Sequence, residues 1–203
     1  MRLGAEEAAR VCGRYQFTAE QSAEILRIAR EVQRKYGDTA WKPGEIRPTV
    51  LAPVVVSNGG QPIPELYRWG YRLPGSLVIN ARAESAEDKP LFRDSVVNGR
   101  CVVPSTGFYE WDSEKRKYLF TLPGSDALYM AGLWSIRDGQ PCCCILTTEA
   151  NASMREVHPR MPLVLSREQV RPWLEDFGAA REILRQTPPM LEKVSADAQL
   201  RLW

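Results

Sequence analysis

The pattern of apolar and polar positions predicts one amphipathic helix near the start of the chain. Segment 18–21 resembles a capping box, four apolar residues then recur at helical spacing, and Gly37 follows as a stop signal. These four residues are Ile25, Ile28, Ala29 and Val32. We expect them to form one buried face of the helix.

Most of the remaining pattern is typical of short β-strands. These segments are rich in β-branched and aromatic residues and are separated by turn residues. They cover residues 45–57, 77–82, 100–104, 117–122, 127–136 and 142–148. Short helices are expected within 90–99 and from Ser166, as the cap, to Phe177. Without regular βαβ alternation, the pattern favours an α+β fold, a single domain with a mixed, largely antiparallel, barrel-like sheet and peripheral helices.

Composition supports a globular protein but does not reveal its function. The chain has 203 residues, of which 44% are hydrophobic and 26% charged, so it can bury a core without disulfides or metal. We expect an extension at 1–10 and one domain at 11–203. The net charge of +2 neither requires nor excludes nucleic acid, because a phosphate-binding groove needs only local arginines.

Targeting and cofactor signals are missing from the sequence. No apolar run is long enough to span a bilayer, and the first ten residues lack the apolar centre of a signal peptide. We therefore expect a cytoplasmic protein, a monomer that does not bind membranes. No glycine-rich phosphate loop of either common type occurs, so no nucleotide cofactor is expected.

The five cysteines indicate reduced thiols rather than disulfides. Their number is odd, and three of them are adjacent at 142–144. A metal site is not expected there, since neighbouring strand positions point to opposite faces and the chain has one histidine. Cys101 and the triplet are instead predicted to be buried strand residues.

Two residues have the chemistry of a general acid or base. His158 is the single histidine and lies in a loop bracketed by prolines, where a structural role is equally open. Glu110 lies among aromatic residues, where burial would raise its pKa, although an exposed strand glutamate would fit the same pattern.

Asn80, Arg160 and Trp69 have two interpretations each, and Arg82 is considered together with Asn80. Asn80 and Arg82 alternate along one predicted strand and can share a face, while Asn80 could also close a turn. Arg160 can bind a phosphate or pair with an acid. Trp69, beside a glycine, can be core or an exposed stacking surface.

Six short motifs occur in the order seen in one protein family. They are CGRY (12–15), RWGY (68–71), NARAE (80–84), RCVVPSTGFYEW (100–111), AGLW (131–134) and HPRMP (158–162). On these motifs, over about residues 11–177, the chain resembles the SOS response-associated peptidase family, whose domain shields abasic sites in single-stranded DNA.

The resemblance implies a DNA-protein crosslinker whose cysteine becomes the first residue after the initiator methionine is removed. Within the reactive site it matches Cys12 to the crosslinking cysteine, Asn80 to the NAR asparagine, Glu110 to the YEW glutamate and His158 to the HxRMP histidine. It also matches Arg14, Arg82 and Arg160 to arginines that hold the DNA backbone, and Trp69 to a residue near the base stack.

These residue types suit the implied chemistry. An abasic sugar equilibrates with an open-chain aldehyde, which an unprotonated amine attacks. An α-amino group, with a pKa of about 8, is partly neutral near pH 7, whereas lysine is almost wholly charged. The thiol of the same cysteine can then close a thiazolidine ring. Glutamate and histidine can move the protons.

The position of Cys12 departs from the family pattern, because eleven residues precede it and its nitrogen is then an amide. Either the leader is removed, or translation starts at Val11, whose GTG codon can be a bacterial start. Codons for residues 6–8 can contain AGGAGG, a ribosome-binding sequence. A genuine N-terminal tail is the alternative.

Two other functions stay open on the sequence alone. A cysteine peptidase would use Cys12, His158 and Glu110 as nucleophile, base and orienting group. A noncovalent reader of damaged DNA would use Trp69 and the arginines without a free amine.

Overall fold

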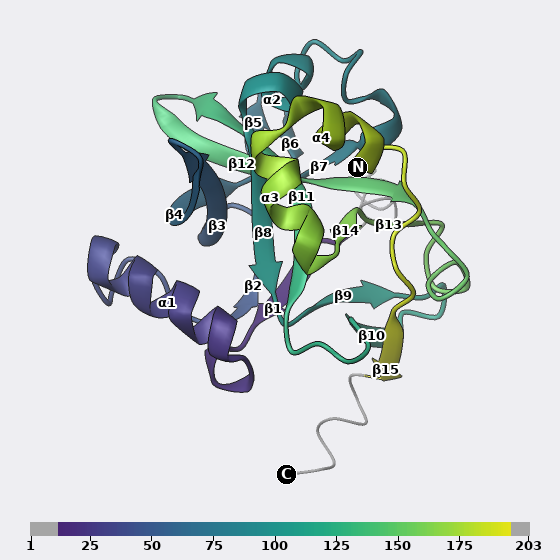
Figure 1. Ribbon diagram of the computed structural model, residues 1–203. Helices are drawn as coiled ribbons and strands as arrows, with labels where there is room; N and C mark the ends of the chain where they lie inside the picture. The colour runs from purple at the N-terminus through teal and green to yellow at the C-terminus, as the bar shows by residue number, and fades with distance from the viewer. Residues whose placement is uncertain (1–11, 196–203) are drawn as a thin grey trace.

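The computed structural model describes residues 12–195 of the chain. Five strands pair in a ring, so that each has two neighbours and the sheet closes into a barrel (Figure 1). In ring order they are β3 (Leu51–Asn58), β4 (Gln61–Trp69), β12 (Gln140–Glu149), β11 (Leu128–Arg137) and β8 (Arg100–Ser105). Within this ring only β4 and β12 pair in parallel. The predicted α+β domain with a largely antiparallel, barrel-like sheet is confirmed.

Three short strands extend the barrel at β12 and β11. They are β7 (Asn80–Arg82) and β13 (Arg160–Pro162), which pair with β12, and β14 (Val164–Leu165), which pairs with β11. A separate hairpin joins β5 (Tyr71–Leu73) to β6 (Ser76–Val78). The second half of β12 therefore has a candidate-site segment on each side.

A second sheet of five antiparallel strands lies beside the barrel. In sheet order its strands are β15 (Glu192–Ser195), β10 (Lys117–Thr121), β9 (Gly107–Trp111), β1 (Arg14–Phe17) and β2 (Gly44–Ile46). The chain passes from β8 into β9 through Gly107, where an added Cβ would lie 2.7 Å from the carbonyl oxygen of Phe120. Glycine is needed at this close approach, which carries the chain toward Glu110.

Short helices cover the outside of these sheets. They are η2 (Ala19–Gln21), α1 (Ala23–Tyr36), η3 (Ala83–Ser85), α2 (Arg93–Asn98), α3 (Arg167–Glu175) and α4 (Phe177–Ile183). Helix α1 packs on β3 and β4, while α3 packs on β8, β11 and β14. None of the helices within residues 12–195 is long and apolar enough to cross a membrane.

The first predicted helix exists, but its predicted start is wrong. Thr18 makes no capping hydrogen bond, and a 3₁₀ turn follows it. Helix α1 begins after Ser22, whose hydroxyl accepts the N–H of Ile25 at 3.2 Å. The predicted apolar face and the stop at Gly37 are confirmed, since all four apolar residues are buried and Gly37 takes a φ of 86°.

The predicted helix after Ser166 is divided in two. The backbone N–H of Ser166 donates to the side chain of Gln169 at 2.9 Å, so Ser166 does begin α3. Asp176 then adopts an extended conformation and ends this helix before Phe177. Its carboxylate accepts the N–H of Ala179 at 3.0 Å and starts α4, because aspartate is a favourable N-cap.

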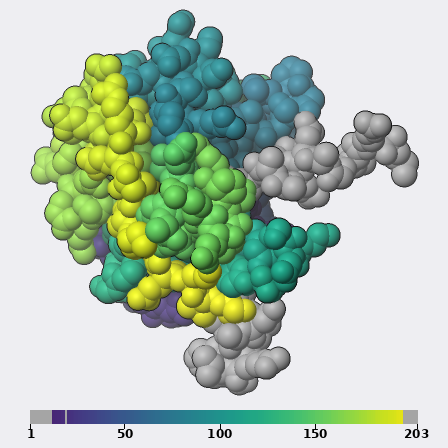
Figure 2. Space-filling model, turned by 90° about the vertical axis from the view of Figure 1, so that its right-hand side faces the viewer, coloured from purple at the N-terminus to yellow at the C-terminus, as the bar shows by residue number. Residues whose placement is uncertain are grey.

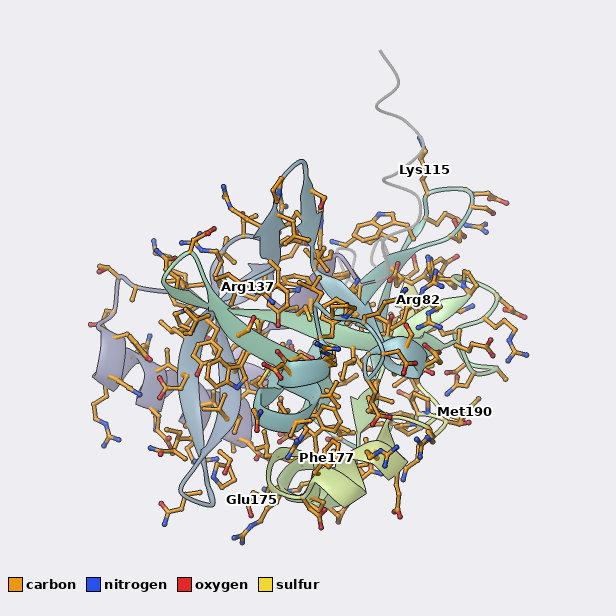
Figure 3. All side chains as sticks on the ribbon, turned by 90° about the horizontal axis from the view of Figure 1, so that it is seen from above. Arg82, Lys115, Arg137, Glu175, Phe177 and Met190 are labelled. Atoms are coloured by element: carbon orange, nitrogen blue, oxygen red, sulfur yellow. The ribbon has the colours of Figure 1, made fainter. Side chains whose placement is uncertain are left out.

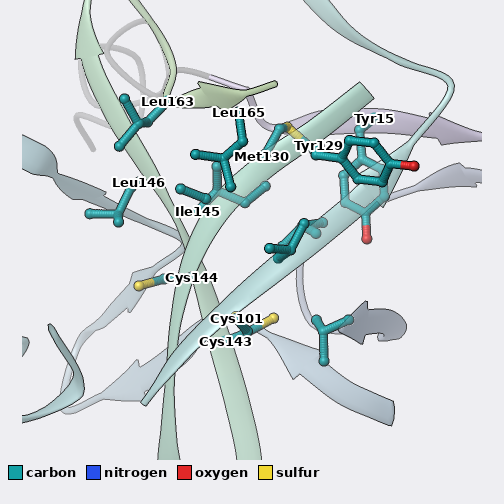
Figure 4. Close-up of a cluster of buried hydrophobic side chains, with 14 of the residues drawn as sticks. Tyr15, Cys101, Tyr129, Met130, Cys143, Cys144, Ile145, Leu146, Leu163 and Leu165 are labelled. Atoms are coloured by element: carbon teal, nitrogen blue, oxygen red, sulfur yellow. The ribbon is translucent and has the colours of Figure 1, made fainter. Parts of the chain in front are cut away.

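The core fills the barrel and also covers the outside of its central strands. Strand β8 is buried along its whole length, as are residues 128–133 of β11 and 142–148 of β12. Figure 4 shows part of this cluster, including Met130, Ile145 and Leu165. Strands buried on both faces have continuous apolar runs rather than alternation.

The cysteines of the strands behave as predicted. All five cysteines of the chain are free and buried, and Cys101 and the triplet at 142–144 lie on the paired strands β8 and β12 of the barrel core. They pack as small apolar residues.

Candidate functional site

Cys12 lies two residues before the start of β1 and is completely buried. Strand β1 pairs with β9, where Arg14 is opposite Tyr109, and this register brings Cys12 beside Glu110. The backbone nitrogen of Cys12 donates a hydrogen bond to Oε1 of Glu110, 98 residues away in the sequence. Its Sγ lies 3.9 Å from Sδ of Met130 on β11. The nitrogen and sulfur of Cys12 are thus held by two different strands.

Glu110 is a buried carboxylate whose side chain is turned away from bulk water. The residue is 3% exposed. Burial raises its pKa to about 7 from the ordinary value of 4.5, although N–H groups of Cys12 and Trp111 act in the opposite direction. The expected increase is confirmed, and the alternative of an exposed glutamate is wrong. At neutral pH this group can both accept and release a proton.

The thiol of Cys12 is held in its protonated form. Burial raises its pKa well above the ordinary value, and the nearby charge of Glu110 raises it further. An activated thiolate would need the opposite environment.

Asn80 and Arg82 lie on β7, as the alternating pattern predicted. Strand β7 runs parallel to β12, with Asn80 opposite Ile145 and Arg82 opposite Thr147. Ala81 between them is buried, while Asn80 is half-buried and Arg82 is exposed (Figure 3). The two side chains therefore share one face of β7.

His158 lies in the loop that leads into β13 and is half-buried. Its Nδ1 lies 3.0 Å from the backbone nitrogen and 3.1 Å from the carbonyl oxygen of Arg160, so this ring nitrogen contacts the Arg160 backbone. Burial lowers its pKa, and the charge of Arg160 lowers it further, while a hydrogen bond with the Arg160 backbone acts against both. The ring is neutral at physiological pH.

The loop that carries His158 is held against the C-terminal part of the described chain. Nδ2 of Asn151 donates to the carbonyl oxygens of Pro188 and Pro189, each at 2.9 Å. Figure 2 shows this loop in green beside the yellow segment that leads to β15. The position of His158 is therefore fixed from both ends of its loop.

Arg160 pairs with an acid, as one of its two interpretations predicted. Its Nη1 and Nη2 donate to the two carboxylate oxygens of Glu84 at 2.7 and 2.9 Å. Nη2 also donates to the carbonyl oxygen of Thr147 at 2.6 Å. Glu84 further accepts from the Thr148 hydroxyl and the Glu149 N–H, each at 3.2 Å. A phosphate could take this guanidinium only by displacing Glu84.

The prediction that Trp69 offers an exposed stacking surface is wrong. Trp69 is 1% exposed, and its Nε1 donates to the carbonyl oxygen of Ile79 at 3.1 Å. Its ring centre lies 5.2 Å from that of Tyr15. Strand β4 turns this side chain into the core, so no base can stack on it.

Arg14 lies on the second sheet with its side chain 39% exposed. Its Nη1 is 3.4 Å from Oε1 of Glu45, and its guanidinium lies 5.2 Å from the ring centre of Trp111. Like Arg82, it reaches solvent.

The predicted residues thus form two groups. Cys12 and Glu110 are in direct contact. Asn80, Arg82, His158 and Arg160 lie on the segments that flank the second half of β12. Within residues 12–195, the hydrogen bonds of the His158 ring go to Arg160 and not to Cys12 or Glu110.

The sequence did not assign roles to Glu84, Met130 and Glu45. Glu84 is the last residue of the NARAE motif, so its position in a motif was the available signal. Met130 lies in an apolar strand where nothing distinguishes it from other core residues. Among the described residues, no group of three or more histidine, cysteine, aspartate or glutamate side chains is placed to hold a metal ion.

Two surface hollows lie away from these residues. One, of about 350 Å³, is lined by residues of α1, and the other, of about 260 Å³, lies between β14, α3 and the segment 186–189. Neither is lined by Cys12, Glu110 or His158. We therefore do not assign them to the candidate site.

Comparison with known proteins gives one consistent result. A family model described as SOS response associated peptidase (SRAP) matches residues 11–200. Abasic site processing protein YoaM of Bacillus subtilis is 30% identical over 192 residues, covering 86% of this chain and 84% of YoaM. Abasic site processing protein YoqW of the same organism is 30% identical over 204 residues, covering 92% of this chain and 89% of YoqW.

A solved structure also has this fold. A protein from Bacteroides thetaiotaomicron superposes with a TM-score of 0.72 at 20% sequence identity, covering 91% of each chain. At this identity the likeness concerns the fold alone.

Proposed function

The chain belongs to the SOS response associated peptidase family, and from this premise we propose that it attaches covalently to abasic sites in single-stranded DNA. The names of YoaM and YoqW, abasic site processing proteins, support the substrate class. The proposal requires that Cys12 be the first residue of the active form.

The contact between the Cys12 nitrogen and Glu110 carries this proposal. Once Cys12 is the first residue, the same nitrogen is an α-amine beside a carboxylate whose pKa is raised to about 7 in the chain with the peptide bond. Such a carboxylate can take a proton from the ammonium and leave the nucleophilic amine. The thiol lies on the same residue, so both reactive atoms arrive together.

The reaction balances without an oxidant or a cofactor. The amine adds to the aldehyde carbon of the open-chain sugar, and loss of one water gives an imine. The sulfur then forms a bond to the imine carbon, and the thiol proton moves to nitrogen. The product is a five-membered thiazolidine. A thiol that stays protonated until the imine forms fits this order of steps.

The second group of residues is assigned to the sugar and its flanking phosphates. His158 can transfer a proton to the sugar oxygen as the sugar ring opens. The amide of Asn80 can orient the sugar without adding charge. Exposed Arg82 and Arg14 can bind phosphates.

A cysteine peptidase mechanism is less well supported. That chemistry needs a thiolate close to a base. The environment of Cys12 raises the pKa of its thiol, and the described hydrogen bonds of the His158 ring go to Arg160. Both observations favour the amine as the first nucleophile.

The test compares three forms of the protein with an oligonucleotide that contains one abasic site. A form that begins at Cys12 should give a covalent adduct of the summed mass minus one water. The 203-residue chain, if it is not cleaved, should give none, and neither should the form whose Cys12 amine is acetylated. The acetylated form is the matched control, because it keeps the thiol and every side chain.

The variant Cys12→Ser separates the two chemical steps. It keeps the amine, so it should form an imine that borohydride traps, but it should not form the thiazolidine. A full-rate adduct with the acetylated form would overturn the proposal. Binding without an adduct in every form would instead indicate a noncovalent reader.

A further inference from the structure

Three cations surround one carboxylate on the sheet next to Cys12. Oε1 of Glu45 lies 3.4 Å from Nη1 of Arg14 and 2.8 Å from Nη2 of Arg47, and Oε2 lies 2.8 Å from Nζ of Lys117. We call these four residues the Glu45 cluster. Three positive charges and one negative charge give the cluster a net charge of +2. Its residues lie on β1, β2 and β10 or directly after β2.

Two aromatic rings of β9 support the cations of this cluster. Nζ of Lys117 lies 3.7 Å from the ring centre of Tyr109 and 5.6 Å from that of Trp111, which also contacts Arg14. Cations held over ring faces keep their charge and lose conformational freedom. The cluster is therefore a preorganised cationic surface.

The cations of the cluster remain accessible to a ligand. The side chains of Arg14, Arg47 and Lys117 are 39%, 62% and 27% exposed. Their carboxylate partner is 26% exposed. Because the three cations and the carboxylate all reach solvent, a competing anion can exchange with the carboxylate.

The position of the cluster relates it to the proposed reaction. Tyr109 and Trp111 are the chain neighbours of Glu110, and Arg14 is two residues from Cys12. Because successive strand residues point to opposite faces, Glu110 faces inward while the two rings face the cluster. A DNA strand whose abasic sugar reaches Cys12 would continue along the β-strands that carry the Glu45 cluster.

We propose that the Glu45 cluster binds the phosphodiester backbone of the DNA strand next to the abasic site, and that phosphates displace the carboxylate of Glu45 from its cations. The inference rests on the proposed function for the identity of the strand. Glu45 is then a competitor of DNA, and its removal strengthens binding. A cluster that only holds the sheet together would give the opposite result.

The experiment measures binding of the 203-residue chain to an undamaged single-stranded oligonucleotide by fluorescence anisotropy over a range of salt concentrations. Glu45→Gln should tighten binding about 3-fold or more at low salt and steepen the salt dependence. Arg47→Ala and Lys117→Ala should each weaken binding and reduce the slope of log K against log salt by about 0.7, the value for one phosphate contact on a single strand.

Matched controls come from surface ion pairs elsewhere. Glu31→Gln removes a carboxylate that is 33% exposed and pairs with Arg27, and Arg171→Ala removes a cation that is 69% exposed and pairs with Glu175. Neither should change the slope. Thermal unfolding of each variant checks the fold, and Arg47→Lys should retain the slope of the parent.

Two results overturn the inference. One is a Glu45→Gln affinity equal to or below that of the parent, and the other is an unchanged slope for Arg47→Ala or Lys117→Ala. If polyglutamate competes as well as the oligonucleotide, the surface fits an acidic protein instead. The adduct assay on the form beginning at Cys12 is independent, so a missing adduct with intact salt effects refutes only the proposed function.

Discussion

Glu110 and Glu84 are the same residue type in opposite surroundings. Glu110 is 3% exposed and accepts an N–H, and burial raises its pKa to about 7. The side chain of Glu84 is 43% exposed and binds both terminal nitrogens of Arg160. Although partial burial raises the pKa of Glu84, the hydrogen bond from Arg160 and further contacts lower it overall.

The comparison indicates that two glutamates of one fold can have different roles, one in proton transfer and the other in positioning a neighbouring side chain. A carboxylate without a cation can exchange a proton near neutral pH, whereas one that is ion-paired stays charged and holds its partner. We therefore assign proton transfer to Glu110. Glu84 is a positioning residue, because it fixes Arg160, whose backbone N–H contacts His158.

The largest expected effect comes from removing the side chain of Trp69, a core residue that packs against β1. Trp69 packs on Tyr15 of β1, the strand that begins two residues after Cys12. Trp69→Ala should lower the free energy of unfolding by about 3–5 kcal/mol, because it leaves a cavity and removes one of the two hydrogen bonds to the Ile79 carbonyl. Urea unfolding measures this. A loss below about 1 kcal/mol would contradict the buried position, and Trp69→Phe is the milder control.

The next prediction uses the pH dependence of stability. In the 203-residue chain, the folded state raises the pKa of Glu110 from 4.5 to about 7, so its contribution is most favourable below pH 4.5 and is lost as pH rises through 7. That gap corresponds to about 3 kcal/mol. Glu110→Gln should therefore gain stability relative to the parent at pH 8 but not at pH 4. Equal differences at both pH values would rule out a raised pKa.

The same substitution should slow the proposed reaction. In the form beginning at Cys12, Glu110→Gln should lower the adduct rate about 100-fold, the lower end for loss of a general acid or base. The pH dependence of the parent rate near neutrality should include the titrations of Glu110 and of the α-amine, and the variant should keep only that of the amine. Gel analysis of adduct against time measures both. A similar loss in Tyr118→Phe, a neighbour on β10, would point to general damage instead.

The smallest effect is expected at Glu84. Glu84→Gln should destabilise the fold by about 1 kcal/mol at pH 7, as for a partly exposed ion pair. Since the folded state lowers the pKa of Glu84, the stabilisation by this group is present above pH 4.5 and is lost as pH falls. The variant has no carboxylate at this position, so it should not show this loss of stability at low pH. Altered ring resonances of His158 in NMR would show the positioning role. Unchanged resonances would assign Glu84 to stability alone.

Most of the fold could be predicted because its signals are local. The spacing of Ile25, Ile28, Ala29 and Val32 predicted the buried face of α1, and the apolar runs predicted four of the five barrel strands, whereas β4 was not predicted. The start of α1 was wrong because Thr18 and Ser22 are both good N-caps, and the choice depends on where the preceding strand ends. The candidate residues came from motifs, which name residue types but not their neighbours.

From the sequence alone, we could identify most of the barrel strands, the apolar role of the strand cysteines and the motifs that contain Cys12 and Glu110. The three-dimensional arrangement was needed to show that Trp69 is core, that Arg160 pairs with Glu84, and that the Cys12 nitrogen contacts a carboxylate 98 residues away. The two kinds of feature differ in how far apart in the sequence the interacting residues lie. Periodicity and capping act over a few residues, whereas burial, pKa and ion pairing depend on strand order and register, which bring distant residues together.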